Sequence, residues 1–154
     1  MQDVNSFLVE WNIRFLENRD VVRKSILSVK KKSEGFDFIV HYKDNIKYFI
    51  VSPILEINLF NILKKEDNAG IFTLNNKENI RFVASKWEDF AGMQFLSIYF
   101  INPFSNLDKV WILQPYVHDK ICDKSSLEFG LKSMSEMVES IGNFELEQKI
   151  KLKK

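Results

Sequence analysis

A pair of apolar segments at residues 36–42 and 46–52 limits the possible folds of this chain more than any other feature of its sequence. Each segment has the length and the β-branched and aromatic content of a strand, and only the polar residues 43–45 separate them. A connection this short predicts an antiparallel hairpin, because parallel strands need a long crossover. Pro53 lacks an amide donor, so we expect the second strand to end there.

The sequence predicts amphipathic helices on both sides of this hairpin. Apolar residues recur at three- and four-residue spacings over residues 4–19, 78–91 and 125–141. Ser125 followed by Glu128 has the pattern of a capping box, which marks the start of the last helix. Glycine follows the second and third of these helices, as is common at helix C-termini.

Other apolar runs predict further strands. Residues 95–101 and 110–113 have strand-like composition, and residues 20–29 contain a β segment. Residues 71–74 are either a short strand or the lead-in to the next helix, and residues 54–70 are either a short helix or a loop. The resulting order, α-β-β-β-α-β-β-α, predicts an α/β protein with a mixed central sheet flanked by helices.

Composition favours a single packed domain. The chain has 154 residues, 45% of them hydrophobic, and no linker-like segment interrupts it. We therefore expect one domain over residues 1–142 and a charged C-terminal tail at 143–154, whose lysines extend to Lys154. Cys122 is the only cysteine, which excludes an intrachain disulfide and favours a reducing compartment. No apolar run approaches the roughly 18 residues of a membrane span, so we expect a cytoplasmic protein outside the membrane.

Three short stretches carry a resemblance to a known family. They are Glu10-Trp11-Asn12-Ile13 on the first helix, Phe36-Asp37-Phe38-Ile39 at the start of one strand, and Tyr48-Phe49-Ile50-Val51 on the next. Together with the order of elements, they resemble the PD-(D/E)xK nuclease superfamily, and within it most closely the archaeal Holliday junction resolvases. The resemblance spans about residues 4–140. It implies a restriction-endonuclease-like fold, a homodimer, and a Mg²⁺ site that includes Glu10 and Asp37.

The active-site pattern of that family is incomplete in this chain. The positions of its acid-x-Lys motif fall on Val51 and Pro53, which can neither bind a metal nor supply a charge. Glu56 is a possible displaced acid. We therefore expect a catalytically impaired protein with Glu10 and Asp37 as vestigial ligands, and with no cofactor unless Mg²⁺-dependent activity is retained.

Basic residues suggest where nucleic acid would bind. Lys30, Lys31 and Lys32 precede the Asp37 strand, where the resemblance places a DNA-facing surface, and Lys43 follows it. Net charge is only +1, so phosphate binding would depend on local clusters of cations. The leading hypothesis is a binder of structured nucleic acid, four-way junction DNA above all, or a partner of a catalytic homologue.

Two other interpretations stay open. The chain also resembles a subunit of an archaeal-type tRNA-splicing endonuclease, a family with a related sheet and metal-free Tyr/His/Lys chemistry. Tyr48 and Lys86 would take two of those places, but no histidine precedes the relevant strand, so this resemblance implies a structural subunit. It would otherwise be a protein-interaction module on the same fold, without a nucleic-acid surface. The sequence leaves the choice between DNA and RNA undecided.

Overall fold

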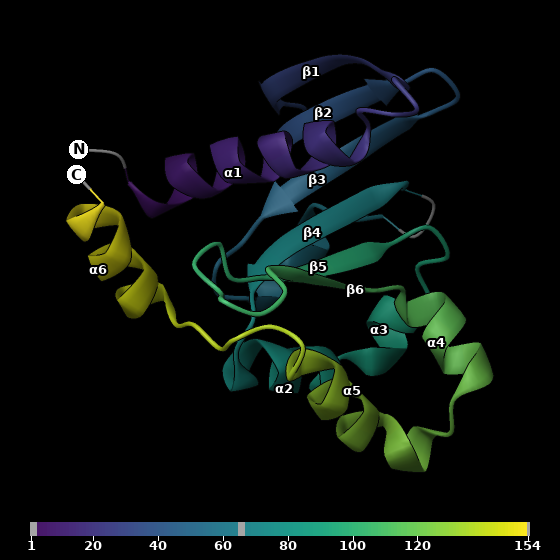
Figure 1. The fold of residues 1–154 in the computed structure, drawn as a ribbon. Coiled ribbons are helices and arrows are strands. Elements are labelled where there is room, and N and C mark those ends of the chain that lie inside the picture. Colours follow the sequence, from purple (N-terminus) through teal and green to yellow (C-terminus); the bar gives the residue numbers. More distant parts are fainter. Residues whose placement is uncertain (1–2, 65–66, 154) are drawn as a thin grey trace.

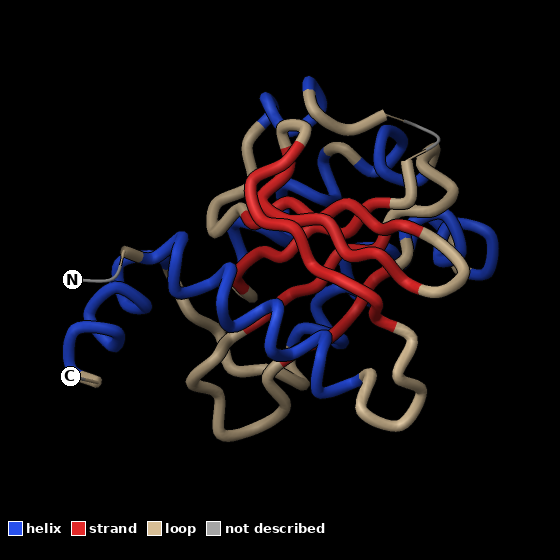
Figure 2. Tube along the Cα trace, turned by 90° about the horizontal axis from the view of Figure 1, so that it is seen from above, coloured by secondary structure: helices blue, strands red, loops and turns tan. Residues whose placement is uncertain are grey.

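A computed structural model describes residues 3–64 and 67–153. Within them, six strands form one open, mixed sheet with helices on both faces (Figures 1 and 2). In chain order the elements are α1 (Val4–Arg19), β1 (Ile26–Ser33), β2 (Phe36–Tyr42), β3 (Ile46–Val51), the 3-10 helix η1 (Ile57–Asn61), β4 (Ala69–Leu74), α2 (Lys77–Ser85), α3 (Trp87–Ala91), β5 (Ser97–Ile101), β6 (Val110–Leu113), α4 (Pro115–Ile121), η2 (Lys124–Ser126), α5 (Leu127–Ser135) and α6 (Asn143–Leu152).

The strands lie in the sheet in the same order as in the chain. β1, β2 and β3 are antiparallel, β3, β4 and β5 are parallel, and β6 returns antiparallel to β5. The predicted hairpin is confirmed, with Phe38 opposite Phe49 and Ile39 opposite Tyr48. The two parallel connections pass through η1 and through α2 and α3, as the long crossover of parallel strands requires.

The central strand β4 is the main departure from the predicted order of elements. All six of its residues are buried, and it lies between β3 and β5. A Cβ added at Gly70 would lie 2.6 Å from the Phe49 ring, so glycine permits the close approach of β4 to β3. Residues 71–74 are therefore part of a strand, and the sheet has one strand more than the sequence order predicts.

Each face of the sheet carries its own apolar core. On one face, α1 and α6 cover a cluster that includes Phe38, Phe49 and Phe72. On the other face, the segment around η1 and helices α2, α3 and α5 cover a cluster that includes Phe100 and Trp111. The alternation of side chains along the strands supplies both clusters, which explains why the inner strands are apolar throughout.

Helices in the second half of the chain differ from the predicted ones. Residues 78–91 form two helices, α2 and α3, which meet at Lys86. The helix predicted at 125–141 ends at Ser135, and the residues after it run as an extended segment across the sheet edge. Helix α4 was not predicted, since its seven residues are too few for a clear helical period.

Residues 143–152 form helix α6 where a charged tail was expected. Leu146 and Ile150 of α6 are buried in the cluster on the α1 face, and α6 packs beside α1, so the first and the last helix are neighbours (Figures 1 and 2). Only two buried apolar residues, four positions apart, mark α6 as a helix, and the charged residues around them led to the prediction of a tail. Lys154 lies outside the described residues.

No helix within the described residues is long and apolar enough to cross a membrane.

Leu146→Ala is expected to lower the free energy of unfolding by about 2–4 kcal/mol, because Leu146 is fully buried between α6 and the sheet. Phe144→Ala is the matched control, since Phe144 is 73% exposed on the same helix, and its effect should stay within about 0.5 kcal/mol. Urea unfolding measures both variants. If residues 143–154 were a solvated tail, both variants would unfold at the same urea concentration as the wild type.

Candidate functional site

The predicted acidic residues have separate partners in the structure. Glu10 is exposed on α1 and forms an ion pair with Lys31 of β1. The hydrogen bond and the charge of Lys31 hold the pKa of Glu10 below its usual value. Glu56 is an exposed residue directly before η1, and its side chain makes no capping hydrogen bond.

Asp37 completes the backbone hydrogen bonding between β2 and β3. Its Oδ2 accepts a hydrogen bond from the amide of Val51 at 2.7 Å, at the end of the strand pair. Val51 is buried, so this amide would otherwise lose its hydrogen bond with water. The carboxylate of Asp37 therefore has a structural partner in the sheet.

The residues implied by the nuclease resemblance do not fit a Mg²⁺ site. Val51 packs its side chain into the core on the α1 face, and the carbonyl of Pro53 accepts a hydrogen bond from Asn79 Nδ2 at 2.9 Å. Among residues 3–64 and 67–153, no three His, Cys, Asp or Glu side chains gather closely enough to hold a metal ion. The expected vestigial pair, Glu10 and Asp37, is thus engaged with Lys31 and with the Val51 amide.

Asparagines occupy the carboxyl edge of the parallel strands, where α/β proteins commonly bind ligands. Asn75 follows β4, donates to the carbonyls of Ser135 and Val138, and accepts from Trp111 Nε1. Asn102 follows β5 and donates to the carbonyl of Glu139 at 3.0 Å. These amides bind the backbone at the end of α5 and in the segment that follows it, beside a groove of about 710 Å³ between α2 and α5 that Asn75 also lines.

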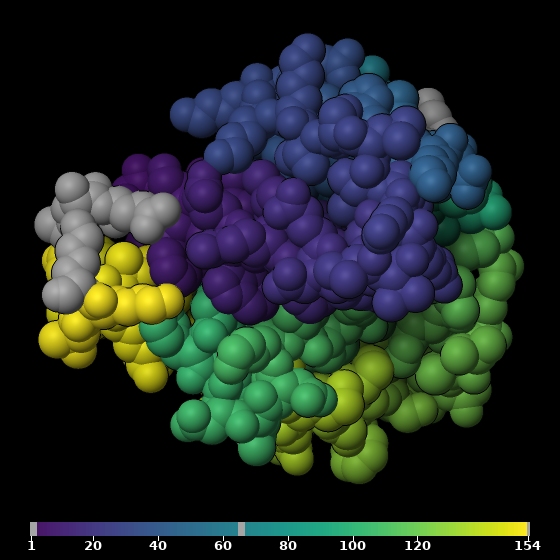
Figure 3. Space-filling model, turned by 45° about the horizontal axis from the view of Figure 1, so that its top comes forward, coloured from purple at the N-terminus to yellow at the C-terminus, as the bar shows by residue number. Residues whose placement is uncertain are grey.

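The predicted lysine surface lies on the edge strand β1. Lys30, Lys31 and Lys32 are exposed there, and Lys31 is the partner of Glu10. Lys43 is exposed in the turn between β2 and β3. Figure 3 shows the atoms of β1 and β2, in blue, directly beside those of α1, in purple. These lysines therefore flank the helix from one side.

A groove on the other side of α1 was not predicted. Its volume is about 770 Å³, and it lies between α1, the start of β6 and the end of α6. The Trp11 and Phe15 rings, one turn apart on α1, stack with centroids 5.7 Å apart and planes 7° apart. The groove is lined by the cations Arg14, Arg19, Lys109 and Lys153 and by the single acid Asp108. We call it the Trp11 groove.

The groove exists because α1 leaves the last strand uncovered. Ile112 of β6 faces the α1 side of the sheet and is 37% exposed, whereas its neighbours Trp111 and Leu113 are buried on the other side. Trp11 and Phe15 are only half-buried on α1, whereas Leu8 is buried in the core. A second helical stripe of aromatic and basic residues, Trp11, Phe15 and Arg19, would have indicated this surface.

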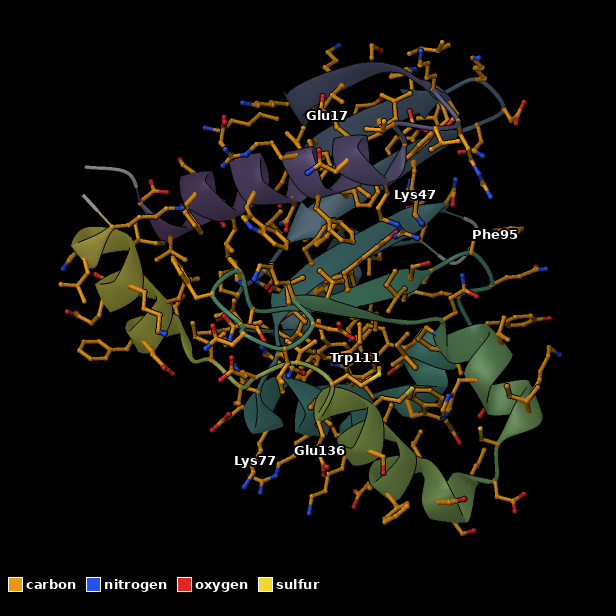
Figure 4. All side chains as sticks on the ribbon, viewed as in Figure 1. Glu17, Lys47, Lys77, Phe95, Trp111 and Glu136 are labelled. Atoms are coloured by element: carbon orange, nitrogen blue, oxygen red, sulfur yellow. The ribbon has the colours of Figure 1, made fainter. Side chains whose placement is uncertain are left out.

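A second hollow adjoins the first and shares Arg19 with it. Its volume is about 560 Å³, and it lies at the amino edge of the parallel strands, near the C-terminal end of α1. Figure 4 shows Lys47 at this end of the sheet, far from Trp111 on the opposite face. The hollow is lined by Leu16, Arg19, Asp20, Arg23, Ser25, Tyr42, Asp44, Asn45, Lys47, Asn68 and Tyr99. We call it the Lys47 hollow.

Lys47 is the most perturbed cation in the structure. Burial, and to a smaller extent the charge of Arg19, lower the pKa of Lys47 to about 8. Its Nζ donates to Tyr99 Oη at 3.3 Å and lies near Ser97 Oγ at 3.5 Å. Burial raises the pKa of Tyr99 to about 12, so its hydroxyl stays neutral at physiological pH. The ammonium group is therefore held by neutral partners.

Asp37→Ala is expected to lower the free energy of unfolding by about 1–3 kcal/mol, because it leaves the buried Val51 amide without an acceptor. Asp37→Asn keeps a side-chain oxygen at that place and should recover most of the loss. Urea unfolding of the two variants measures the difference. Equal losses would show that the charge of Asp37, and not its hydrogen bond, stabilises the fold.

Lys47→Met is expected to raise the free energy of unfolding at pH 7 by about 1–2 kcal/mol, since it removes a buried cation. The unfolded lysine has the ordinary pKa of 10.5, so between pH 8 and 10.5 the unfolded wild type binds more protons than the folded form. Wild-type stability should therefore rise relative to the variant over that range. Lys132→Met, at an exposed lysine of α5, is the control and should show no such trend. A Lys47→Met variant less stable than the wild type at pH 7 would contradict this account.

A scan of protein-family models gave no match to this chain, and searches of curated proteins and of solved structures gave none either.

Proposed function

We propose that this protein binds nucleic acid with unpaired bases, and that the Trp11 groove is its contact surface. The observation that supports this proposal is the stacked pair of Trp11 and Phe15 with four cations around it. Proteins that hold single strands combine aromatic rings, on which bases stack, with cations that follow the phosphates. The groove contains both components on one surface.

The contacts assign a role to each part of the groove. Trp11 offers a half-buried indole, and Phe15 supports it from one turn further along α1. Lys109 and Lys153 approach from the two segments that border the groove, the loop before β6 and the end of α6. The groove thus has an aromatic floor for bases and basic margins for phosphates.

The resemblance to junction resolvases supports a branched substrate. Helix α1 followed by the antiparallel strands β1, β2 and β3 agrees with the first half of the predicted order of elements. We propose a nuclease-like scaffold that binds branched or single-stranded nucleic acid. Glu10 and Asp37 have other partners, so we expect binding to be independent of Mg²⁺.

The protein is expected to bind a single strand and a four-way junction more tightly than a duplex of equal length. Fluorescence anisotropy with labelled oligonucleotides measures the affinity across a salt titration, with and without Mg²⁺. Affinity should fall steeply with salt, because each phosphate contact releases counterions. Cleavage of the junction in Mg²⁺ would show a nuclease with a displaced acid. No binding to any of the three nucleic acids would exclude the proposal.

Groove variants locate the contact. For a single strand, the logarithm of the binding constant falls linearly with the logarithm of the salt concentration. The double variant Lys109→Gln with Lys153→Gln should reduce the magnitude of this slope by about 1.4, at roughly 0.7 for each phosphate contact. Trp11→Leu keeps an apolar side chain and should weaken binding by about tenfold through lost stacking. The matched control is Lys77→Gln with Lys132→Gln, which removes the same charge from the groove between α2 and α5. If the control weakens binding as much as the groove variants, the contact surface lies elsewhere.

A further inference from the structure

We propose that the Lys47 hollow binds a phosphomonoester dianion, supplied as the terminal phosphate of the strand that lies in the Trp11 groove. The strand as the source rests on the proposed function, whereas the phosphate site itself rests on the hollow alone. The two surfaces are adjacent, because Arg19 lines both of them.

Lys47 is a half-buried cation without a counterion among the described residues. None of their carboxylates lies within 4.0 Å of its Nζ, and its hydrogen-bond acceptors are the hydroxyls of Ser97 and Tyr99. Its ammonium group also lies 5.6 Å from the ring centres of Phe49 and Tyr99. A buried charge is costly unless it is paired, so an anion in the hollow would stabilise this arrangement.

The acids of the hollow leave its cations available. Asp20 Oδ1 accepts hydrogen bonds from the amide and hydroxyl of Ser25, and Oδ2 accepts from the Ile26 amide at 2.8 Å. The carboxylate of Asp20 thus fixes the turn between α1 and β1. Asp44 is exposed in the turn between β2 and β3. Neither acid forms an ion pair with Arg19, Arg23 or Lys47.

The chemistry of the lining fits a phosphate better than a carboxylate. Guanidinium groups of Arg19 and Arg23 offer paired donors that match phosphate oxygens, and Lys47 adds a point charge. Tyr42 and Asn68 contribute neutral polar groups. The three cations outnumber the carboxylates of Asp20 and Asp44, so the lining keeps a net positive charge for an anion.

The route between groove and hollow passes Arg19. Its guanidinium lies 5.5 Å from the centre of the Phe15 ring, so it stands between the aromatic floor and the hollow. A base stacked on Trp11 would place the following phosphates toward Arg19. The cavity of about 560 Å³ has the size of a small-ligand pocket, with room for a phosphate and its sugar.

The test compares one single strand in three forms, with a 5′-phosphate, with a 3′-phosphate and with hydroxyls at both ends. Wild-type protein should bind one phosphorylated form about tenfold more tightly than the hydroxyl form. Lys47→Met and Arg23→Gln should lose this gain while still binding the hydroxyl form. Lys132→Met, on the opposite face, should keep the gain. Circular dichroism confirms that each variant is folded.

A parallel arm separates the two sources of phosphate. Thermal unfolding is followed with inorganic phosphate and with a nucleoside monophosphate, for the wild type and for Lys47→Met. Stabilisation of the wild type alone, without binding of any strand, would support the phosphate site and overturn the proposed function. Strand binding that is equal for all three forms, with no stabilisation by either phosphate compound, would overturn this inference and leave the proposed function standing.

Discussion

The carboxamide of Asn75 is the contact on which the closure of the sheet depends. Its nitrogen donates to the carbonyls of Ser135 at the end of α5 and of Val138 after it, and its oxygen accepts from Trp111 Nε1. Its backbone carbonyl also accepts from the amide of Ile141. One residue at the end of the central strand thereby fixes a segment about sixty positions later in the chain. Without these bonds, several buried backbone groups would lack partners, at a cost of about 1–3 kcal/mol each.

The segment that Asn75 holds limits the space for a ligand at the carboxyl edge of the parallel strands. The segment fixed by Asn75 carries the chain from the α5 face to the α1 face, where α6 packs beside α1. This crossing covers part of the carboxyl edge of the parallel strands, beside the groove between α2 and α5. At the amino edge, the side chain of Lys47 lines a hollow. The Lys47 hollow therefore lies at the opposite end of the parallel strands from Val51 and Pro53, where the nuclease resemblance placed its acid-x-Lys motif.

Local patterns in the sequence predict the elements whose burial is periodic. Helix α1, the β2–β3 hairpin and strand β6 follow from their spacing of apolar residues and from the turn between the strands. Strand β4 is buried on both faces, so it has no alternation to distinguish it from the start of a helix. Long-range contacts are invisible in the same way. Asp37 looks like a metal ligand until the register places its carboxylate against the Val51 amide.

Asn12 and Lys47 are polar residues whose side chains lose contact with water in the fold, but only Lys47 lines a cavity. Asn12 is fully buried, and neither its amide nitrogen nor its oxygen finds a partner among the described residues. We find no structural compensation for it. The ammonium group of Lys47 also loses hydration free energy on folding, but it borders a cavity that an anion can enter. A bound anion would offset the lost hydration of Lys47, because a ligand that binds only the folded state adds its binding free energy to stability. The protein is therefore expected to gain stability when an anion binds at Lys47. Asn12 lines none of these cavities, so no ligand can offset the cost of its burial in the same way.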